Sequence, residues 1–364
     1  MISAMPPDYS LSGEQKQHFL EHGFIKLEDC FSTEDELCKG LMYRVWERLD
    51  MDPNDKETWN PWRGTQMPFS PAIVRSFHLP RYHDAIPIRD FCPKAWAAIC
   101  ELCGGEERID TGSSSTPGLD SSVQDIALSV INDGFIVNVG DKSDEAKWKA
   151  AAQQGHPSGP DNLTPAQQKL LDPHDRDNWH VDGDFFHHFL DSKEQALLPI
   201  VLFKDIKVGG GGTMICPDAI PTMAEHLAAH PEGLMPDMMS IEGREKPYKD
   251  FDHGFFDEAV KPVPKDKFKT ATGKAGDIYL LHPLMVHSAA PNYLREPRFI
   301  TNPPVALKQP FNFDRTDGSA YSLVEQKTLN ALGHPEGLKG WKITTERKLI
   351  VPERVREQAQ MKKI

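Results

Sequence analysis

Long hydrophobic runs are missing from this sequence of 364 residues. No stretch of roughly 18 apolar residues, the least that a membrane-spanning helix requires, occurs in it. The first residues, MISAMPPD, lack the basic start and apolar segment of a secretory signal. The last residues, MKKI, differ from the S-K-L type of peroxisomal signal. We therefore expect a cytoplasmic protein that has no membrane partner.

Positive charge is also scarce. Lysine and arginine number 41 against 54 acidic residues, which gives a net charge of −13. Nucleic-acid-binding proteins usually carry clustered basic residues, and an anionic membrane likewise attracts positive charge. The composition therefore argues against a nucleic-acid partner, and the excess of acidic residues favours solubility.

The six cysteines form no even framework, and reduced thiols are the expectation for such a pattern in an intracellular protein. Two of them have C-x-x-C spacing, but no second pair accompanies them, so neither a zinc site nor a redox site is expected there. The six are Cys30, Cys38, Cys92, Cys100, Cys103 and Cys216.

The chain can form one elaborated domain with a large core, because 39% of its residues are hydrophobic. We expect a mainly helical flank at residues 1–125, a β core at 126–310 and a C-terminal extension at 311–364. Residues 141–177 are rich in Gly, Pro, Asn and charge, which indicates an insertion in the core. The insertion is either a lid over a pocket or a passive surface excursion.

Helix start signals occur in the first part of the chain. Ser12 with Gln15, and Thr33 with Glu36, have the spacing of a capping box. In that motif the two side chains satisfy each other's backbone N–H groups at the helix start. The predicted helices span residues 12–23, 33–49 and 93–102, with two more in the insertion at 147–154 and 165–171.

Short apolar runs separated by turn residues replace the helical pattern beyond residue 126. Strands at such intervals are typical of a jelly roll or barrel. The expected fold class is therefore α+β with a mainly β core. The clearest predicted strands occupy residues 135–139, 198–203, 278–281 and 298–300.

The triplet His180-Val181-Asp182 offers two metal-binding side chains. On an extended strand, residues i and i+2 project from the same face, so both side chains can reach one ion. His287, on a distant predicted strand, would add a third ligand. Two imidazoles and one carboxylate leave three coordination positions open, an arrangement that favours non-haem Fe(II) oxygen chemistry.

Arg298 adds a fixed cation beyond His287, and its planar guanidinium can bind a carboxylate bidentately. His282 is the rival candidate for the third ligand position. His187 and His188 are less favoured as ligands, because the phenylalanines around them indicate an aromatic wall or a core strand.

The wider pattern resembles a known family. After the His180 triplet, and a gap of about a hundred residues, comes G-D-x-x-x-L-H-P-x-x-x-H-S-x-x-P-N followed by Arg298. This pattern is similar to that of the phytanoyl-CoA hydroxylase-like (PhyH) branch of the Fe(II)/2-oxoglutarate-dependent dioxygenases. The resemblance extends from Leu11 to about Val305.

The resemblance implies a fold, a site and a reaction. The fold would be a double-stranded β-helix of jelly-roll or cupin type. His180, Asp182 and His287 would be the iron ligands, Arg298 would pair with the C5 carboxylate of 2-oxoglutarate, and the Thr213 hydroxyl would also meet that cosubstrate. With Fe(II), 2-oxoglutarate and O2, such an enzyme oxidises an unactivated C–H bond of a small molecule by hydroxylation, desaturation or ring closure.

The sequence departs from the family pattern at two places. Pro217 is followed by Asp-Ala-Ile where relatives often read G-S-H, and Ala289 stands where many have a serine. The Ser288 hydroxyl would face the other way, so the cosubstrate carboxylate would depend more on Arg298 and Thr213. Because Asp182 is present rather than a small residue, no coordination position is freed for halide, which disfavours halogenation.

Two other functions fit the same ligand triad. A jelly-roll zinc hydrolase could use it to activate water, and a catalytically silent protein could keep the scaffold for binding alone. Arg298 and Thr213 argue against the hydrolase, since water activation needs no clamp for a keto acid. The presence of all three ligands argues against the silent protein.

The substrate is predicted to be a small amino acid or a natural-product intermediate, because arginines among aromatic residues suit a small carboxylate. A coenzyme A ester would need a basic rim, which the net charge of −13 does not indicate. For each candidate wall residue, ordinary packing or surface exposure is the alternative. The candidate walls are Trp59, Trp62, Arg63, Arg75, His78, Phe185 and Trp341-Lys342-Ile343.

Overall fold

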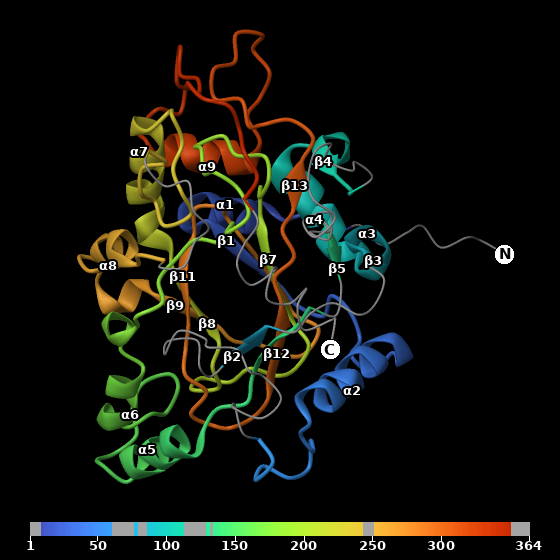
Figure 1. Ribbon diagram of the computed structural model, residues 1–364, viewed down its shortest axis with the longest axis vertical. Helices are drawn as coiled ribbons and strands as arrows, with labels where there is room; N and C mark the ends of the chain where they lie inside the picture. The colour runs from blue at the N-terminus through green and yellow to red at the C-terminus, as the bar shows by residue number, and fades with distance from the viewer. Residues whose placement is uncertain are drawn as a thin grey trace, which may run out of the picture.

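The computed structural model describes residues 9–59, 76–78, 86–112, 129–131, 134–242 and 251–350. Helices and antiparallel sheets are both present, and the sheets lie at the centre of the molecule with most of the helices around them (Figure 1). Within these ranges, no helix has the length and apolar character needed to cross a membrane.

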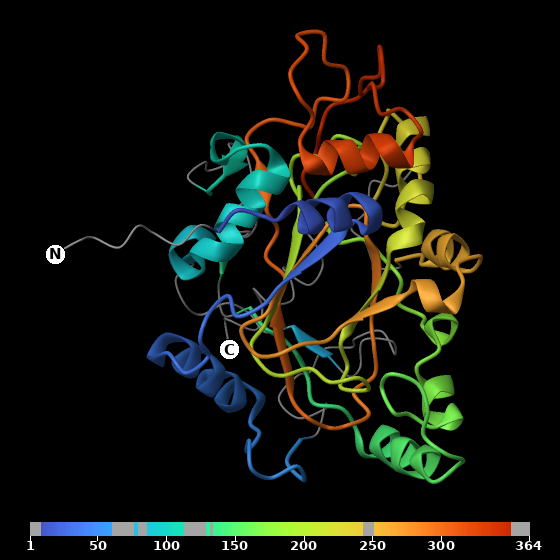
Figure 2. The same cartoon turned by 180° about the vertical axis from the view of Figure 1, so that it is seen from behind.

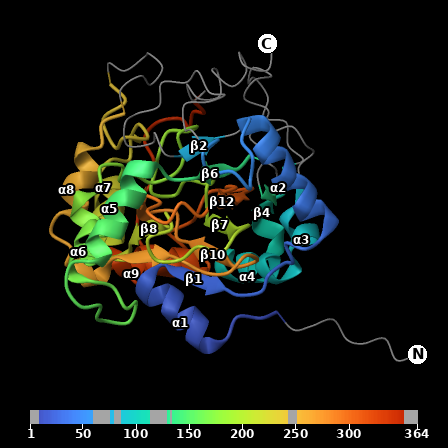
Figure 3. The same cartoon turned by 90° about the horizontal axis from the view of Figure 1, so that it is seen from below.

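A six-stranded antiparallel sheet is the largest unit of the fold, and its strands follow one another across the view in Figure 3. Most of its strands are short, and the chain crosses between distant positions of the sheet. In sheet order the strands are β1 (Phe24–Leu27), β10 (Ile278–Leu281), β7 (Leu198–Leu202), β12 (Arg298–Thr301), β6 (Ile136–Asn138) and β2 (Ser76–His78).

A three-stranded antiparallel sheet carries the other half of the candidate site. Its central strand is β8 (Thr213–Cys216), with β11 (Val286–Ala289) on one side and β9 (Lys269–Ala271) on the other. Two further strand pairs are small. These are β3 (Ile86–Pro87) with β5 (Val130–Ile131), and β4 (Ile109–Asp110) with β13 (Ala306–Leu307).

One face of the large sheet meets the segments that flank the small sheet. Arg298 and Asn138 are cross-strand partners and therefore lie on the same face. Arg298 Nη1 donates to the carbonyl of Gly211, just before β8, at 2.9 Å, and Asn138 Nδ2 donates to the carbonyl of Ala290, just after β11, at 3.3 Å. These bonds tie the two sheets together at one end.

The opposite face of the large sheet is covered by aromatic packing. Phe299 lies on this face and contacts Trp46 of α2 (Glu36–Leu49), with ring centroids 5.3 Å apart. Phe203 packs edge-on against Phe135 at 4.9 Å and against Phe91 of α3 (Ile88–Phe91) at 6.2 Å. This outer face therefore holds α2 and α3, while Arg298 and Asn138 lie on the opposite, inner face.

Four further helices pack together at one end of the sheets. Helix α9 (Leu323–Ala331) contacts α1 (Gly13–His22), α4 (Pro93–Cys103) and α7 (Ile220–Ala229), and Figure 2 shows α1 and α9 side by side. Outside the insertion, the described residues form one more helix and four short turns. They are α8 (Gly254–Val260) and the 3-10 turns Glu106–Arg108, Pro173–Asp175, Pro217–Ala219 and Lys265–Lys267.

The insertion contains the two predicted helices, α5 (Lys142–Ala152) and α6 (Pro165–Leu170), which pack against each other. Trp148 of α5 stacks on Tyr293, with ring centroids 5.4 Å apart, and the Tyr293 hydroxyl donates to the carbonyl of Leu170 at 3.0 Å. The insertion is therefore attached to the loop after β11. Its predicted role as a lid stays a prediction.

The first predicted capping box is confirmed, and the second is wrong. Ser12 Oγ accepts from the N–H of Gln15, and Gln15 Oε1 accepts from the N–H of Ser12. In contrast, α2 begins at Glu36 after Asp35, with no side-chain capping bond. Ser32 Oγ accepts from the N–H of Glu34 instead, and this local turn keeps the preceding residues out of the helix.

Two other predicted elements, a helix and a strand, differ from the structure by more. Helix α5 begins five residues before the expected 147, because the Asp141 carboxylate caps it by accepting from the N–H of Asp144 at 2.9 Å. The strand expected at His180–Asp182 is a single bridge at His180. Gly183, with φ of 120°, turns the chain immediately afterwards; a Cβ there would lie 2.6 Å from the Phe186 ring.

Candidate metal centre

The backbone places His180 and His287 side by side. The N–H of His180 donates to the carbonyl of His287 at 3.0 Å, and the N–H of His287 donates to that of His180 at 2.9 Å. This is a hydrogen-bonded antiparallel pair at the edge of β11. The two imidazole centroids are therefore only 4.4 Å apart.

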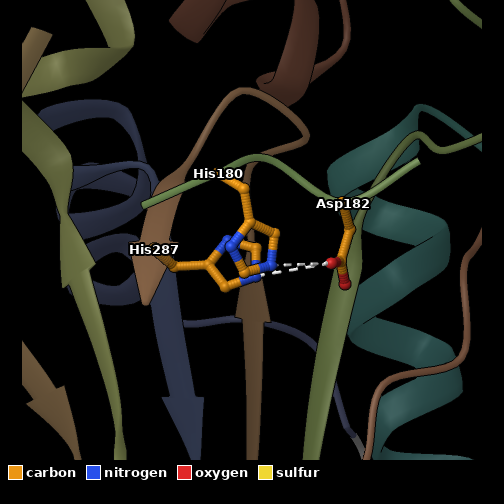
Figure 4. A group of neighbouring side chains, drawn as sticks. All are labelled: His180, Asp182 and His287. Atoms are coloured by element: carbon orange, nitrogen blue, oxygen red, sulfur yellow. Dashed lines mark ion pairs between the residues drawn. The ribbon is translucent and has the colours of Figure 1, made fainter. Parts of the chain in front are cut away.

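The Asp182 carboxylate completes a cluster with these imidazoles. Its Oδ1 lies 3.5 Å from Nε2 of His180 and 3.5 Å from Nε2 of His287. Figure 4 shows both rings directed at this one carboxylate oxygen. Ligands bonded to one ion at about 2.1 Å lie roughly 3 Å from each other, so the three side chains fit a shared metal ion. The structure thus brings the three predicted ligands together.

The outer nitrogens of both imidazoles are held in the same way. His180 Nδ1 lies 2.8 Å from the carbonyl of Asn178, and His287 Nδ1 lies 3.0 Å from the carbonyl of Met285. A carbonyl oxygen can only accept, so each Nδ1 carries the hydrogen and donates it. Each Nε2 therefore faces the centre of the cluster, where a neutral imidazole offers its lone pair to a metal ion and a protonated imidazole donates to Asp182.

The cluster is electrostatically suited to a cation. Burial alone would raise the pKa of Asp182, but the charge of His287 and the hydrogen bonds from both imidazoles lower it well below its usual value. Burial alone would lower the pKa of His287, but the adjacent Asp182 charge raises it. The carboxylate is therefore ionised, and positive charge between it and the imidazoles is stabilised.

Asn302 is a neighbour of the cluster that the sequence analysis did not identify. Its side-chain Nδ2 donates to Oδ2 of Asp182 at 2.7 Å. A polar residue just past a strand looks like an ordinary turn residue in the sequence. The available signal was its spacing, because residues 298, 300 and 302 share one face if the extended conformation continues.

Arg298 is buried on the inner face of the large sheet and reaches toward the start of β8. Its Nη1 donates to the carbonyl of Gly211, two residues before Thr213. Burial lowers the pKa of Arg298 to about 10, which leaves the guanidinium charged at neutral pH. A buried cation therefore lies beside the strand entry that carries the predicted Thr213.

Thr213 shares a face of the small sheet with His287. In this sheet His287 pairs with Ile215, and Ala289 pairs with Thr213. Paired residues lie on the same face, and the facing alternates along each strand. Thr213 and His287 therefore face the same side, whereas Ser288 faces the opposite side, as expected from the sequence.

His282 is in a different environment from the three clustered side chains. Its Nε2 bonds to Thr328 Oγ1 at 3.0 Å, and its Nδ1 accepts from the N–H of Leu284 at 3.2 Å. Burial lowers the pKa of His282 to about 3. It is a neutral histidine that joins the β10 end to helix α9, and it takes no part in the cluster.

His188 also has a structural environment. Its Nε2 lies 2.8 Å from the carbonyl of Gly183, and its ring stacks on Phe186 with centroids 4.4 Å apart. Burial lowers the pKa of His188 to about 4. The residue therefore supports the turn that follows Asp182.

The predicted substrate walls are only partly described. Trp59 stacks on Trp46 at 5.4 Å, and Trp341 Nε1 donates to the carbonyl of Ala228 at 3.0 Å. These contacts are ordinary packing. Phe185 contacts Phe186, with ring centroids 4.9 Å apart. Trp62, Arg63, Arg75 and the side chain of His78 lie outside the described residues.

Comparisons with known proteins give only distant likenesses. No family model and no curated protein matches the chain. A solved structure of the non-haem α-ketoglutarate-dependent carbocyclase SnoK from nogalamycin biosynthesis is 14% identical, with a TM-score of 0.35 over 96% of this chain and 100% of that chain. EctD from S. alaskensis is 15% identical, with a TM-score of 0.31 over 86% of this chain and 85% of that chain. EvdO2 from Micromonospora carbonacea is 13% identical, with a TM-score of 0.35 over 83% of this chain and 95% of that chain. At such scores the function has to be inferred from the site itself.

Proposed function

We propose that this protein is a non-haem Fe(II)- and 2-oxoglutarate-dependent oxygenase of the phytanoyl-CoA hydroxylase-like kind, with a double-stranded β-helix core, that oxidises a C–H bond of a small molecule. One observation carries the proposal. His180, Asp182 and His287 each offer one ligand atom, and these atoms all lie within 4.8 Å of one another. Two imidazoles and one carboxylate on one side of an ion are the ligand set of non-haem Fe(II) oxygenases.

In this proposal, His180, Asp182 and His287 hold the iron, while Arg298 and Thr213 bind the far carboxylate of 2-oxoglutarate. The bound iron supplies the coupling of 2-oxoglutarate decarboxylation, to succinate and CO2, with oxidation of the substrate by O2. The chain itself supplies position. Both imidazoles are oriented through Nδ1, and the guanidinium is buried and fixed through Gly211.

Arg298 supports this function over a water-activating hydrolase. Such a hydrolase uses its metal to activate a water molecule and has no need of a second, buried cation. A planar guanidinium on the inner face of the sheet is instead suited to a dicarboxylic keto acid. The identity of the oxidised substrate stays at the predicted class, a small amino acid or a natural-product intermediate.

The test is succinate formation by anaerobically prepared protein after addition of Fe(II), 2-oxoglutarate and O2, with a panel of amino acids and acyl compounds. We expect His180→Ala and Asp182→Ala to abolish turnover, and the exposed His334→Ala to retain it. Binding of 2-oxoglutarate to the metal-loaded protein is measured in parallel by calorimetry. A wild-type protein that binds neither the metal nor 2-oxoglutarate contradicts the proposal.

A further inference from the structure

Each of the three clustered side chains has one polar contact directed away from the cluster. The two imidazoles donate through Nδ1 to the carbonyls of Asn178 and Met285. The carboxylate of Asp182 accepts through Oδ2 from the side chain of Asn302 at 2.7 Å. The Asp182 contact differs from the others in one respect: it comes from a side chain, which a substitution can remove.

The two oxygens of the Asp182 carboxylate have different partners. Oδ1 faces the two Nε2 atoms at 3.5 Å, whereas Oδ2 is engaged by Asn302. An ionised carboxylate can only accept hydrogen bonds, so the group in contact with Oδ2 is the amide NH2 and not the amide oxygen. An ion at the cluster would therefore meet one oxygen of Asp182, with the second oxygen held away.

The backbone around Asp182 has little regular structure to hold the side chain in place, which makes the bond from Asn302 important. Only His180 in the ligand triplet is bridged to a neighbouring strand, and Gly183 turns the chain directly after Asp182. The Asp182 carbonyl accepts from Gln195 Nε2 at 3.5 Å, which is a long contact. The side-chain bond to Asn302 is thus the short contact that fixes the direction of the carboxylate.

We infer that Asn302 is a positioning residue for the metal centre, which holds Asp182 in a monodentate orientation. This inference rests on the proposed function for the identity of the ion, but it concerns the binding of any divalent ion at the cluster. Asn302 follows β12, four residues beyond Arg298. Arg298 begins β12 and Asn302 directly follows it, so in extended backbone the two residues lie roughly 13 Å apart.

Calorimetric titration with Mn(II) and Co(II) under anaerobic conditions tests the inference. Asn302→Leu keeps the approximate shape and removes the donor, and Asn302→Gln retains an amide donor on a longer side chain. Loss of an outer hydrogen bond to a metal ligand typically weakens binding roughly 10- to 100-fold. We expect a loss in this range for Asn302→Leu, partial recovery for Asn302→Gln, and no change for the exposed Asn330→Leu.

The visible absorption of bound Co(II) separates positioning from a general structural effect. When Oδ2 is released, Asp182 can chelate the ion through both oxygens, the coordination number rises and the Co(II) bands weaken. We expect this change in Asn302→Leu, with the melting temperature of the metal-free protein close to that of wild type. Equal Mn(II) affinity and an unchanged Co(II) spectrum in Asn302→Leu overturn the inference.

The outcome is independent of the oxygenase assignment. Wild-type protein that binds Mn(II) but neither binds 2-oxoglutarate nor forms succinate contradicts the proposed function alone, and the Asn302 comparison is still decisive. Wild-type protein that binds no divalent ion contradicts both. Normal turnover with unaltered metal binding in Asn302→Leu contradicts only the positioning role.

Discussion

Arg298 combines burial with a fixed direction. Its Nη1 is bonded to the Gly211 carbonyl, and the side chain is only 2% exposed. A guanidinium can donate to a carbonyl with one nitrogen and still present other N–H groups to a carboxylate, because it has five donors in a planar fork. The contact with Gly211 therefore orients the cation without using all of its donors.

Replacement of Arg298 by lysine is expected to impair 2-oxoglutarate binding selectively. An ammonium is a point charge that cannot reproduce the bidentate geometry. We expect at least a roughly tenfold weaker 2-oxoglutarate affinity in R298K, since loss of one good charge-assisted hydrogen bond costs about 1.5–3 kcal/mol. Calorimetry on the Mn(II)-loaded protein measures the effect. An equal loss of Mn(II) affinity in the variant would mean that the residue acts on the fold instead.

The residues of the cluster were predictable to different degrees. The spacing of His180 and Asp182 was sufficient to predict a shared direction, although the expected strand is only one bridge. His287 was preferred to His282 because Ser-x-x-Pro-Asn follows it and because of its spacing to Arg298. Asn302 was missed, because a single polar residue just past a strand belongs to no motif, and its partner Asp182 lies 120 positions away.

Helix α1 shows how local signals and tertiary contacts combine in one element. Its start is fixed by the reciprocal bonds of Ser12 and Gln15. Its end is fixed at Gly23, which has φ of 71° and donates its N–H to the carbonyl of Phe19 at 2.7 Å. A Cβ on Gly23 would lie 2.3 Å from Cδ1 of Ile220 in α7. The helix end therefore depends on both backbone conformation and close packing.

Gly23→Ala is expected to destabilise the protein. The left-handed conformation costs a residue with a Cβ about 1–2 kcal/mol, and the contact with Ile220 adds to this. Gly13→Ala, at the first position of the same helix, is the matched control, because a Cβ there meets nothing within 4 Å. Urea unfolding of the two variants tests the difference. Equal stability of both would contradict a close approach between α1 and α7.

Strands marked by apolar runs were easier to predict than strands of two residues. The strands β7, β10 and β12 lie within one or two residues of their predicted bounds, because runs of buried apolar residues mark them. The start of α2 was misplaced, since the Ser32 turn competes with the helix. Strands of two residues, such as β13, have no sequence pattern of their own and are defined only by their partners.

At the scale of the whole molecule, Glu325 links α9 to the rest of the fold. Its carboxylate accepts from Arg108 at 3.1 and 3.2 Å and from Arg315 at 2.7 Å. It also accepts from the N–H groups of Ser322 and Asn312. Burial alone would raise the pKa of Glu325, but the bonds with Arg108 and these N–H groups lower it to about 2.

This carboxylate should make the fold sensitive to acid. Its pKa is lower in the folded state than the ordinary 4.5, so its stabilising effect is complete above about pH 4.5 and is lost as the pH falls toward 2. The shift corresponds to at most about 3.5 kcal/mol. We expect E325Q to be less stable than wild type at pH 7 and to lose less stability between pH 5 and 3.

Chemical denaturation across this pH range measures the slope. The exposed Glu225→Gln serves as the control and is expected to follow the wild-type curve. Parallel curves for wild type and E325Q would contradict the proposed link between Glu325 ionisation and stability.

The predicted division of the chain at residues 125, 141–177 and 311 stays a prediction at this scale, as does the cytoplasmic location.

The paired backbone bonds between His180 and His287 have a thermodynamic consequence. Because peptide groups set the spacing of the two imidazoles, their order belongs to the folded polypeptide and does not have to be created by an arriving ion. Binding of an ion would then leave the chain almost unchanged. The heat-capacity change on binding would be small, and so would the loss of conformational entropy. A preformed site of this kind discriminates between ions by their preferred coordination geometry more than by their charge.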